Sequence, residues 1–430
     1  MAAGYSSFLS TRNKSKPRAI VLSRPLTGLA TVRALHRAGI ATQALVFSDR
    51  DLVRHTRMAE LVEVPAQARG GDALIEFLLQ WPRCAVDERP ALIPVCDEHA
   101  LLLSRHAQRL ATHFRLWTTS HDELLRIISK DRLCTIASAL DLPVVPGIIE
   151  PTPEQLEQWS AAHNGPYLLK PFYVGAPGSS VHDKNCRFET RDELLGHVRS
   201  HGARAAIVQR MLRGGDGYIF DCYGLCDASG HIVQMATHRR WRQNNPDCGT
   251  TSFGEIPAGL PADQDDTLFA QTRTLLGGLR YHGIFGIEWL LDRESGRFRL
   301  IDFNARPFSS IGHLVDCGLN LPALAFRELT GSLPSGLEPQ PRLRRLRWVD
   351  FYRDLQTFRT LHAARKLRFL EWFASTLRCR SWAYWNWRDP MPALMRTGKL
   401  LRHLYELMFF NGNRRDEQPD CRPASHDVTY

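Results

Sequence analysis

The stretch Gly283–Pro307, GIFGIEWLLDRESGRFRLIDFNARP, decides the fold of this chain. Two runs rich in strand-forming residues, 284–292 and 298–306, flank the segment RESGR. That segment is typical of a hairpin turn, with Gly296 at the reversal. The stretch therefore predicts two antiparallel strands joined by a short connection.

The register of this hairpin places two acidic residues opposite each other. If Asp292 pairs with Phe298, then Glu288 faces Asp302, because the positions of antiparallel partners add up to a constant. Opposed like charges destabilise a pair of strands, so the two carboxylates need a counter-cation. Mg²⁺ fits, because it prefers oxygen ligands and usually takes one or two protein carboxylates together with nucleotide phosphates and water.

Side-chain alternation adds two further polar residues, Asn304 and Arg306, to the face that carries Asp302. The opposite face is apolar, which indicates a sheet with one buried side. That apolar face is expected to carry Trp289, Leu291, Ile301 and Phe303. A solvated hairpin edge with ordinary charges is the alternative interpretation.

The overall composition is that of an ordinary globular protein. The 430 residues are 43 % hydrophobic and 23 % charged, which leaves room for two to four domains. No apolar run approaches the ~20 residues of a membrane span. Ten scattered cysteines without a C-x-x-C pair indicate reduced thiols and a cytoplasmic protein. Residues 1–18 lack the apolar segment of a secretory signal, and we expect a disordered lead-in.

The formal net charge of +10 is concentrated in one region. Fifteen Lys/Arg and four Asp/Glu lie between Arg342 and Arg402, and the remainder of the chain is close to neutral. The basic helices there carry no recognisable nucleic-acid-binding motif, so nucleic acid is not an expected partner.

Residues 19–115 are predicted to form an N-terminal α/β domain with a mainly parallel sheet. Three buried-strand signals, at 19–23, 44–47 and 91–95, alternate with helical segments. The first turn lacks G-x-G-x-x-G, so a dinucleotide site is not predicted. Asp97 follows the third of these strands, where it is placed either for a ligand at the strand ends or in an ordinary polar loop.

Residues 116–330 contain further short signals in a definite order. A loop of small residues lets backbone N–H groups approach phosphate oxygens, and a neighbouring lysine adds a point charge. In chain order the signals are Lys130 with Asp131 on a helix, Lys170-Pro171 ending a strand, the loop with Gly178, Ser179 and Ser180, Gln209 before Gly214-Gly215-Asp216, and an Arg-rich segment with Arg240 and Arg242 that ends at Gly249.

With the final Glu288 … Asp302-Phe303-Asn304-Ala305-Arg306, this order of parts resembles the ATP-grasp superfamily, and within it the carboxylate–amine ligase-like proteins. The resemblance covers roughly residues 19–330. It implies an α/β pre-ATP-grasp domain followed by an α+β ATP-grasp domain at 116–330, with subdomains at about 116–205 and 206–330 that clasp ATP.

Carried over residue by residue, the resemblance implies a nucleotide site and a metal site. Lys130 and Lys170 contact the α- and β-phosphates, close to the loop of Gly178, Ser179 and Ser180. The adenine lies against the segment that runs from Gln209 through Arg210, Met211 and Leu212, and the ribose lies near Asp216. Glu288, Asp302 and Asn304 hold Mg²⁺, with Mn²⁺ as an alternative metal. Arg306, with Arg240 or Arg242, holds the transferred phosphoryl group and the acyl phosphate.

The sequence departs from the usual family pattern at two of these positions. Asp302 stands where the family usually has Glu, and Arg210 stands where it usually has Glu after the glutamine. The first departure shortens a metal ligand, and the second changes the nucleotide contacts.

Residues 331–410 are predicted to form a helical, basic C-terminal region, and residues 411–430 a disordered tail. Arg and Lys alternate there with apolar residues at helical spacing, and five of the ten tryptophans fall in this region. Packing against the catalytic body with a solvated basic face is the first interpretation. Docking on an anionic surface through 342–402, either an acidic polymer or the inner face of a membrane, is the second.

The sequence thus predicts an ATP- and Mg²⁺-dependent ligase. It activates a small-molecule or polymer-borne carboxylate as an acyl phosphate, which an amine or similar nucleophile attacks. An ATP-grasp kinase and a non-catalytic nucleotide-binding scaffold that docks through the basic region are the alternatives.

Overall fold

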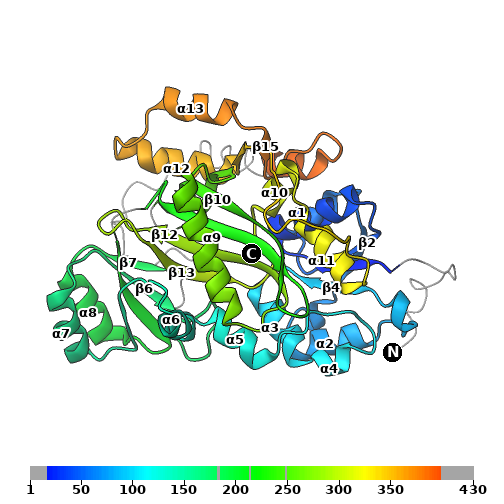
Figure 1. Cartoon of the computed structure of the whole chain (residues 1–430), viewed down its shortest axis with the longest axis horizontal. Coiled ribbons are helices and arrows are strands. Elements are labelled where there is room, and N and C mark those ends of the chain that lie inside the picture. Colours follow the sequence, from blue (N-terminus) through cyan, green and yellow to red (C-terminus); the bar gives the residue numbers. More distant parts are fainter. Residues whose placement is uncertain (1–16, 182–184, 213–214, 247–248, 399–430) are drawn as a thin grey trace, which may run out of the picture.

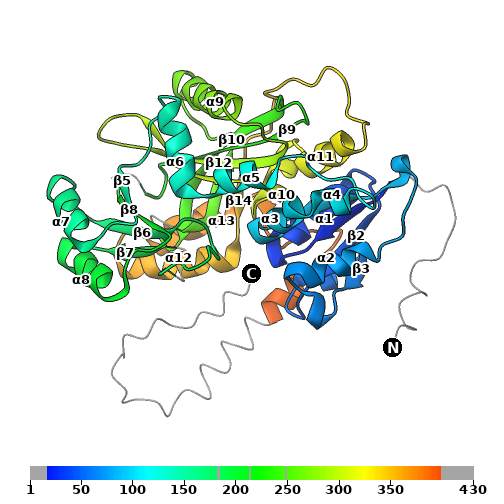
Figure 2. The same cartoon turned by 90° about the horizontal axis from the view of Figure 1, so that it is seen from below.

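The computed structural model describes residues 17–181, 185–212, 215–246 and 249–398. The described residues form three β-sheets in a row (Figure 1). Figure 2, the view from below, again shows the largest sheet between a smaller N-terminal sheet and a second small sheet that α7 and α8 cover. Of the predicted lead-in at 1–18 and the predicted tail at 411–430, only Pro17 and Arg18 fall within the described residues.

Helices cover these sheets and connect their strands. Their bounds are α1 Pro25–Arg37, α2 Gly71–Leu79, α3 Asp97–Arg105, α4 Ala107–Leu110, α5 His121–Ile128, α6 Lys130–Ala139, α7 Pro153–Ala162, α8 Arg191–His201, α9 Ala262–Gly277, α10 Ile311–Cys317, α11 Leu321–Leu329, α12 Phe351–Ala363 and α13 Phe369–Leu377. None of the helices in the described residues is long and apolar enough to cross a membrane.

The N-terminal sheet is fully parallel, as predicted for residues 19–115. Its strands are β1 Ala19–Leu22, β2 Thr42–Val46, β3 Glu60–Glu63 and β4 Ala91–Pro94, in the order β3-β2-β1-β4. Strands β1, β2 and β4 are buried along their whole length. Accordingly β1, β4 and the second half of β2 are apolar runs in the sequence, whereas β2 begins with the buried polar residues Thr42 and Gln43. The exposed strand β3 gave no such signal.

The second small sheet is antiparallel. Its strands are β5 Gly147–Ile149, β6 Tyr167–Pro171, β7 Cys186–Phe188 and β8 Ala206–Arg210, in the order β5-β8-β6-β7. Strand β8 pairs with both β5 and β6. The boundary expected between residues 205 and 206 is therefore misplaced, because it separates β8 from the sheet to which it belongs.

The large sheet has seven strands and carries the hairpin that decides the fold. Its order is β13-β12-β9-β10-β11-β14-β15. The strands are β9 Ile219–Cys226, β10 Ile232–Asn244, β11 Thr250–Ile256, β12 Gly283–Leu291, β13 Phe298–Asn304, β14 Leu346–Val349 and β15 Ser381–Trp382. One face packs on α5, α6 and α9 around buried aromatic side chains such as Trp289 and Phe303.

The register of the hairpin was predicted correctly at Glu288 and wrongly at its turn. Glu288 pairs with Asp302, but Phe298 pairs with Leu291 instead of Asp292. A β-bulge between the pairs of Glu288 and Trp289 absorbs the one-residue difference.

The bulge also moves one side chain to the other face of the sheet. Ile301 was expected beside Trp289, yet it packs against the cluster that contains Leu290, Leu212 and Val145. A bulge makes two residues oppose one, so strict alternation fails at that point.

The C-terminal region differs from the expected set of helices. Helices α12 and α13 are present, but Leu346–Val349 forms β14, which pairs with β11, and Ser381–Trp382 forms β15, which pairs with β14. The region at 331–398 therefore completes the large sheet and also covers it with helices. Residues 391–398 are helical, and the rest of the predicted helical region, 399–410, falls outside the described residues.

Candidate active site

Two carboxylates and two cations form the centre of the candidate site. Glu288 on β12 and Asp302 on β13 face each other, and both side chains are about 15 % exposed. The Lys130 ammonium at the start of α6 lies 3.2 Å from Asp302 Oδ2. Arg240 Nη2 on β10 lies 2.7 Å from Glu288 Oε1. The repulsion between the carboxylates is thus relieved by cations from two other elements.

The end of β13 connects this centre to the N-terminal domain. Asn304 Nδ2 donates to Glu288 Oε1 over 2.9 Å, and its Oδ1 accepts from Arg306 Nη2 over 3.1 Å. Arg306 Nε and Nη2 donate to the two carboxylate oxygens of Asp97 over 2.9 and 3.1 Å. Asp97 is the first residue of α3, so the polar position flagged after β4 lies at the site.

The Arg306–Asp97 pair sets the charge state of this part of the site. Burial acts to lower the pKa of Arg306, and the Asp97 carboxylate outweighs it, so the pKa is raised. Burial likewise acts to lower the pKa of Lys130, and Asp302, Asp97 and Glu288 outweigh it. Both cations are therefore fully charged at neutral pH.

Arg240 forms a bidentate ion pair with Asp221, a residue that the sequence did not indicate. Asp221 on β9 accepts from both Nε and Nη2 of Arg240, and the Asp221 side chain is fully buried. His238 Nδ1 lies 2.7 Å from Asp221 Oδ2, and the Tyr223 hydroxyl donates to the same oxygen over 3.1 Å. Burial acts to raise the pKa of Asp221, but Arg240 and His238 lower it to about 2.

Asp221 could have been found only with the strand order in hand. It pairs with Glu288 across β9 and β12, and β9 is separated from β12 by more than 50 residues of sequence. The bidentate clamp fixes the plane of the Arg240 guanidinium and leaves its Nη1 directed elsewhere than the Asp221 carboxylate.

Lys170 is buried at the end of β6 in the small antiparallel sheet. It lies near Cys134 of α6, because the charges of both Lys170 and Lys130 act on that thiol. Burial nevertheless dominates and raises the pKa of Cys134 to about 11. The two predicted phosphate-binding lysines are thus close to one neutral thiol, and this brings the small sheet next to the carboxylate centre.

The loop after β6 makes its contacts within the small sheet. Gly178 has φ +70°, and its carbonyl accepts from Arg204 Nε over 2.6 Å. The hydroxyls of Ser179 and Ser180 donate to backbone carbonyls in the segment 202–205. The loop is therefore held in this conformation by the hydroxyls of Ser179 and Ser180 and by the Arg204 guanidinium.

The predicted adenine segment lies at the junction of the two antiparallel sheets. The N–H groups of Arg210 and Met211 already donate to the carbonyls of Pro146 and Pro166. Gln209 Oε1 is buried and has no hydrogen-bond partner among the described residues. An unsatisfied buried acceptor beside an apolar cluster of Leu212, Leu290 and Ile301 fits a flat ring that carries an amino group.

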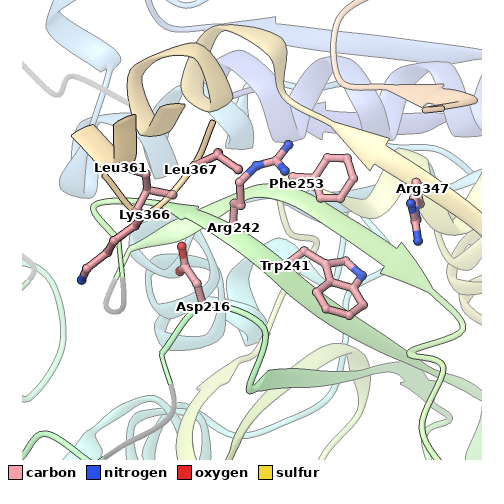
Figure 3. Close-up of a pocket in the computed structure, with 8 residues that line it drawn as sticks. All are labelled: Asp216, Trp241, Arg242, Phe253, Arg347, Leu361, Lys366 and Leu367. Carbon is pink, nitrogen blue, oxygen red and sulfur yellow. The ribbon is translucent and has the colours of Figure 1, made fainter. Parts of the chain in front are cut away.

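Asp216 and Arg242, the remaining predicted residues, lie at a separate cavity. This cavity has a volume of about 410 Å³, between the ends of β10 and β11 and the segment that joins α12 to α13 (Figure 3). Its lining residues are Asp216, Trp241, Arg242, Phe253, Arg347, Leu361, Lys366 and Leu367. Asp216 Oδ1 accepts from Gln243 Nε2 over 3.0 Å.

Arg242 is not brought to the carboxylate centre. Its Nε and Nη2 donate to the two oxygens of Asp354 on α12 over 2.8 and 2.7 Å, and its Nη1 donates to Ser375 on α13. A register irregularity between Arg240 and Arg242 on β10 separates the two guanidiniums. Of the two arginines offered by the sequence, Arg240 lies at the site and Arg242 holds the C-terminal helices.

The donor set of the centre fits a hard divalent cation. Glu288 and Asp302 offer carboxylate oxygens and Asn304 an amide oxygen, which are the ligands that Mg²⁺ prefers. Counting Asp97 and Asp221, four carboxylates face the three cations Lys130, Arg240 and Arg306. With Lys170 nearby, the cations equal these carboxylates in number, so the fit to a metal ion rests on the oxygen ligands of Glu288, Asp302 and Asn304.

Comparison with known proteins supports the fold. No protein-family model matches the chain. A D-aspartate ligase from Enterococcus faecium (strain Aus0004) is 22 % identical over 321 residues, which cover 70 % of this chain and 74 % of that protein.

The solved structures that resemble this chain include enzymes bound to nucleotides. An ADP complex of N5-carboxyaminoimidazole ribonucleotide synthetase superposes with a TM-score of 0.60 at 15 % identity, over 78 % of this chain and 81 % of that chain. A biotin carboxylase from Campylobacter jejuni, also in a nucleotide complex, gives 0.59 at 13 % identity over 78 % and 75 %. The ATP-grasp fold expected from the sequence is thereby confirmed.

Proposed function

We propose that this chain, which has the ATP-grasp fold, is an ATP- and Mg²⁺-dependent ligase that joins a carboxylate to an amine. ATP phosphorylates the carboxylate to an acyl phosphate, and the amine displaces phosphate to give the amide. The matched proteins named as ligase, synthetase and carboxylase support this reaction type.

One observation carries the proposal. Five charged residues converge on one partly buried centre from four elements and the segment that follows β13: Glu288 on β12, Asp302 on β13, Lys130 on α6, Arg240 on β10, and Arg306 just after β13. Burying this many charges is costly unless they act together. In phosphoryl transfer the protein mainly positions groups and neutralises charge, and this centre supplies both kinds of group.

The nucleotide is held between the small antiparallel sheet and the large sheet. Lys170 and Lys130 contact its phosphates, with the N–H groups of the loop around Gly178 as further donors. The adenine amino group donates to Gln209 Oε1, and the ring packs on Leu212. The ribose extends from there toward the Asp216 carboxylate, which lies at the edge of the separate cavity lined by Trp241 and Arg242 and would accept from the ribose hydroxyls.

Glu288 and Asp302 would hold the metal. Asn304 joins them if its side-chain amide turns so that Oδ1 faces Glu288, because Nδ2 occupies that side in this structure. When bound, Mg²⁺ would supply positive charge that neutralises the charge developing on the transferring phosphoryl group, and Mn²⁺ is a suitable substitute.

The two arginines of the centre have different tasks. Arg240, fixed by Asp221, holds the transferring phosphoryl group in one orientation. Arg306 binds the substrate carboxylate and then the acyl phosphate, for which the Asp97 carboxylate is a stand-in here. Substrate binding therefore requires Arg306 to exchange Asp97 for the incoming carboxylate, and the released Asp97 can orient the amine.

The test is a screen of ADP release against pools of carboxylates and amines. Acidic amino acids of both configurations belong in the carboxylate pool, because the matched Enterococcus protein is named a D-aspartate ligase. Hydroxylamine in place of the amine should trap the acyl phosphate as a hydroxamate. Absence of carboxylate-dependent ADP release across the pools, with ATP bound, would contradict the ligase assignment and favour a scaffold.

A kinase is the alternative reaction on the same centre. It would give a phosphorylated product that accumulates without an amine and does not react with hydroxylamine. The tight charge clamp at Arg240 suits either outcome, so product analysis decides between them.

The place of the protein in the cell is part of the proposal. We expect a cytoplasmic enzyme, because the eight cysteines within the described residues are all free. Its C-terminal region offers exposed side chains for peripheral attachment to the inner face of a membrane.

A further inference from the structure

The outer face of α13 is apolar and exposed. Phe369, Leu370, Phe373 and Leu377 are 52, 75, 45 and 63 % exposed, although these side chains are usually buried. They recur at helical spacing, so they form one stripe along α13. We call these four residues the docking face. In Figure 1, α13 lies at the outer edge of the molecule, beyond α12.

Basic residues flank the docking face at both ends. Arg365, Lys366 and Arg368 precede α13, and Arg378 and Arg380 follow it. All five are exposed, and none forms an ion pair with a described residue. Glu371 is the single acidic residue between them. An apolar stripe with unpaired cations at its ends is typical of helices that lie in a membrane interface.

The opposite face of α13 fixes the helix to the body. Trp372 is 6 % exposed, stacks on Phe358 of α12 at 4.6 Å between ring centroids, and donates its Nε1–H to Asp354 over 2.8 Å. Ser375 accepts from Arg242 of the large sheet. The docking face is therefore held in place by the fold and does not depend on a partner for its helical conformation.

We propose that this face attaches the protein to an anionic membrane surface, with the four apolar side chains in the headgroup region and the flanking cations on lipid phosphates and carboxylates. The proposal goes beyond the ligase reaction and does not depend on it. It assigns the membrane attachment that the sequence suggested for residues 342–402 to α13 and the basic residues at its two ends.

The charges around the docking face disfavour a second copy of the chain as its binding partner. A symmetric dimer through the docking face would bring the same five cations of each copy together, and Glu371 alone would oppose them. An anionic lipid surface instead attracts each of these cations, and the attraction adds up along the helix.

The tryptophans contribute less than the sequence suggested. Trp372 points into the body, and Trp382 and Trp385 are partly buried. Trp387, at 85 % exposure, is the one of the four that lies open to solvent in the described residues. The apolar part of the attachment thus rests on the docking face.

Co-sedimentation of the full chain with vesicles tests the proposal. Vesicles of phosphatidylcholine with added phosphatidylserine should bind the protein at low salt, and pure phosphatidylcholine vesicles should not. The triple variant Arg365→Gln, Arg378→Gln, Arg380→Gln should bind roughly a hundredfold more weakly, at about fivefold per cation. Moderate salt should weaken wild-type binding because it screens these charges.

The apolar half is tested by Leu370→Glu with Leu377→Glu. This double variant should lose vesicle binding and keep its thermal unfolding temperature, because both side chains are already in water. Matched controls remove exposed groups elsewhere: Val86→Glu with Ile149→Glu, and Arg57→Gln with Arg83→Gln and Arg280→Gln. The controls should bind as the wild type does.

Three outcomes would overturn the proposal. Equal binding to neutral and anionic vesicles removes the role of the cations, and unchanged binding by the α13 variants removes the role of this helix. If the protein forms a dimer without lipid and the Leu370→Glu, Leu377→Glu variant is a monomer, the docking face is a contact between two copies of the chain. ATP turnover in solution is measured in parallel, so failure here is distinct from failure of the ligase assignment.

Discussion

Replacing Arg242 should destabilise the protein far more than it slows the reaction. Asp354 is fully buried and accepts four hydrogen bonds, two from Arg242 and one each from Ser252 and Trp372. Removing one member of such a buried pair costs about 3–5 kcal/mol, because the other charge is left without its partner. We therefore expect Arg242→Met and Asp354→Leu each to lose this much.

The size of the effect in a melting experiment follows from the chain length. At about 2.1 cal/mol/K per residue, 430 residues give an unfolding entropy of roughly 0.9 kcal/mol/K. If the chain unfolds as one unit, 3–5 kcal/mol lowers Tm by roughly 3–6 °C. The double variant should cost about as much as one single variant, since it removes both charges and takes a partner away only from the uncharged side chains of Ser252, Trp372 and Ser375.

Differential scanning fluorimetry and ATP turnover well below Tm measure the two quantities separately. Arg242→Met should keep kcat within about threefold, which is less than 1 kcal/mol of barrier. Arg240→Met is the matched control on the same strand, and it should lower kcat by about 10²–10³ because it removes a charge at the centre. A loss of that size in Arg242→Met, with Tm unchanged, would refute the structural role.

Three further outcomes are expected. Glu288→Gln and Asp302→Asn should each abolish Mg²⁺-dependent ATP turnover with circular dichroism unchanged, and near-wild-type turnover in either would make the metal assignment wrong. Lys170→Met should weaken ATP affinity whereas Arg306→Ala should chiefly lower kcat, since the lysine meets phosphates of free ATP and the arginine meets charge that develops later; equal effects on ATP affinity would contradict this division. The pKa of Asp221 is lowered to about 2, so its carboxylate stabilises the fold above its ordinary pKa and loses that contribution as pH falls from about 4 to 2. In urea denaturation, Asp221→Asn should be about 2 kcal/mol less stable than wild type at pH 5–8, and this difference in stability should close below pH 4. A constant difference down to pH 2 would exclude an ionised Asp221 paired with Arg240.

The parts of the fold that local patterns control were predictable from sequence. Strands β1 and β4 and the second half of β2 are buried on both faces and are short apolar runs, and the pairing of Glu288 with Asp302 follows from the hairpin. The bulge at Ile301 was not predictable, because a bulge leaves no mark in an alternating pattern. It changed the side of the sheet on which one side chain lies without changing the acidic pair.

The parts that depend on distant pairing were not predictable. Asp221 lies next to Glu288 only because β9 pairs with β12, and Arg242 meets Asp354 only because α12 returns to β10. Strand β14 has only four residues and lies among several arginines. Its own pattern is therefore weak, and the helical pattern of the segments after it led to the prediction of helices for the whole region. Such residues gain their roles from tertiary contacts between segments far apart in the chain.

The order of strands has a consequence for how the protein is made on the ribosome. Strand β11 ends at Ile256, and its partner β14 begins at Leu346, so about 90 residues are translated before this edge can pair. At about 5–20 residues per second, the open edge persists for roughly 5–20 s on each nascent chain. An unpaired strand edge is prone to pair with another chain during that interval. Nascent chains should therefore need a chaperone, or a low local concentration of other nascent chains, until the C-terminal strands emerge and pair with the open edge of β11.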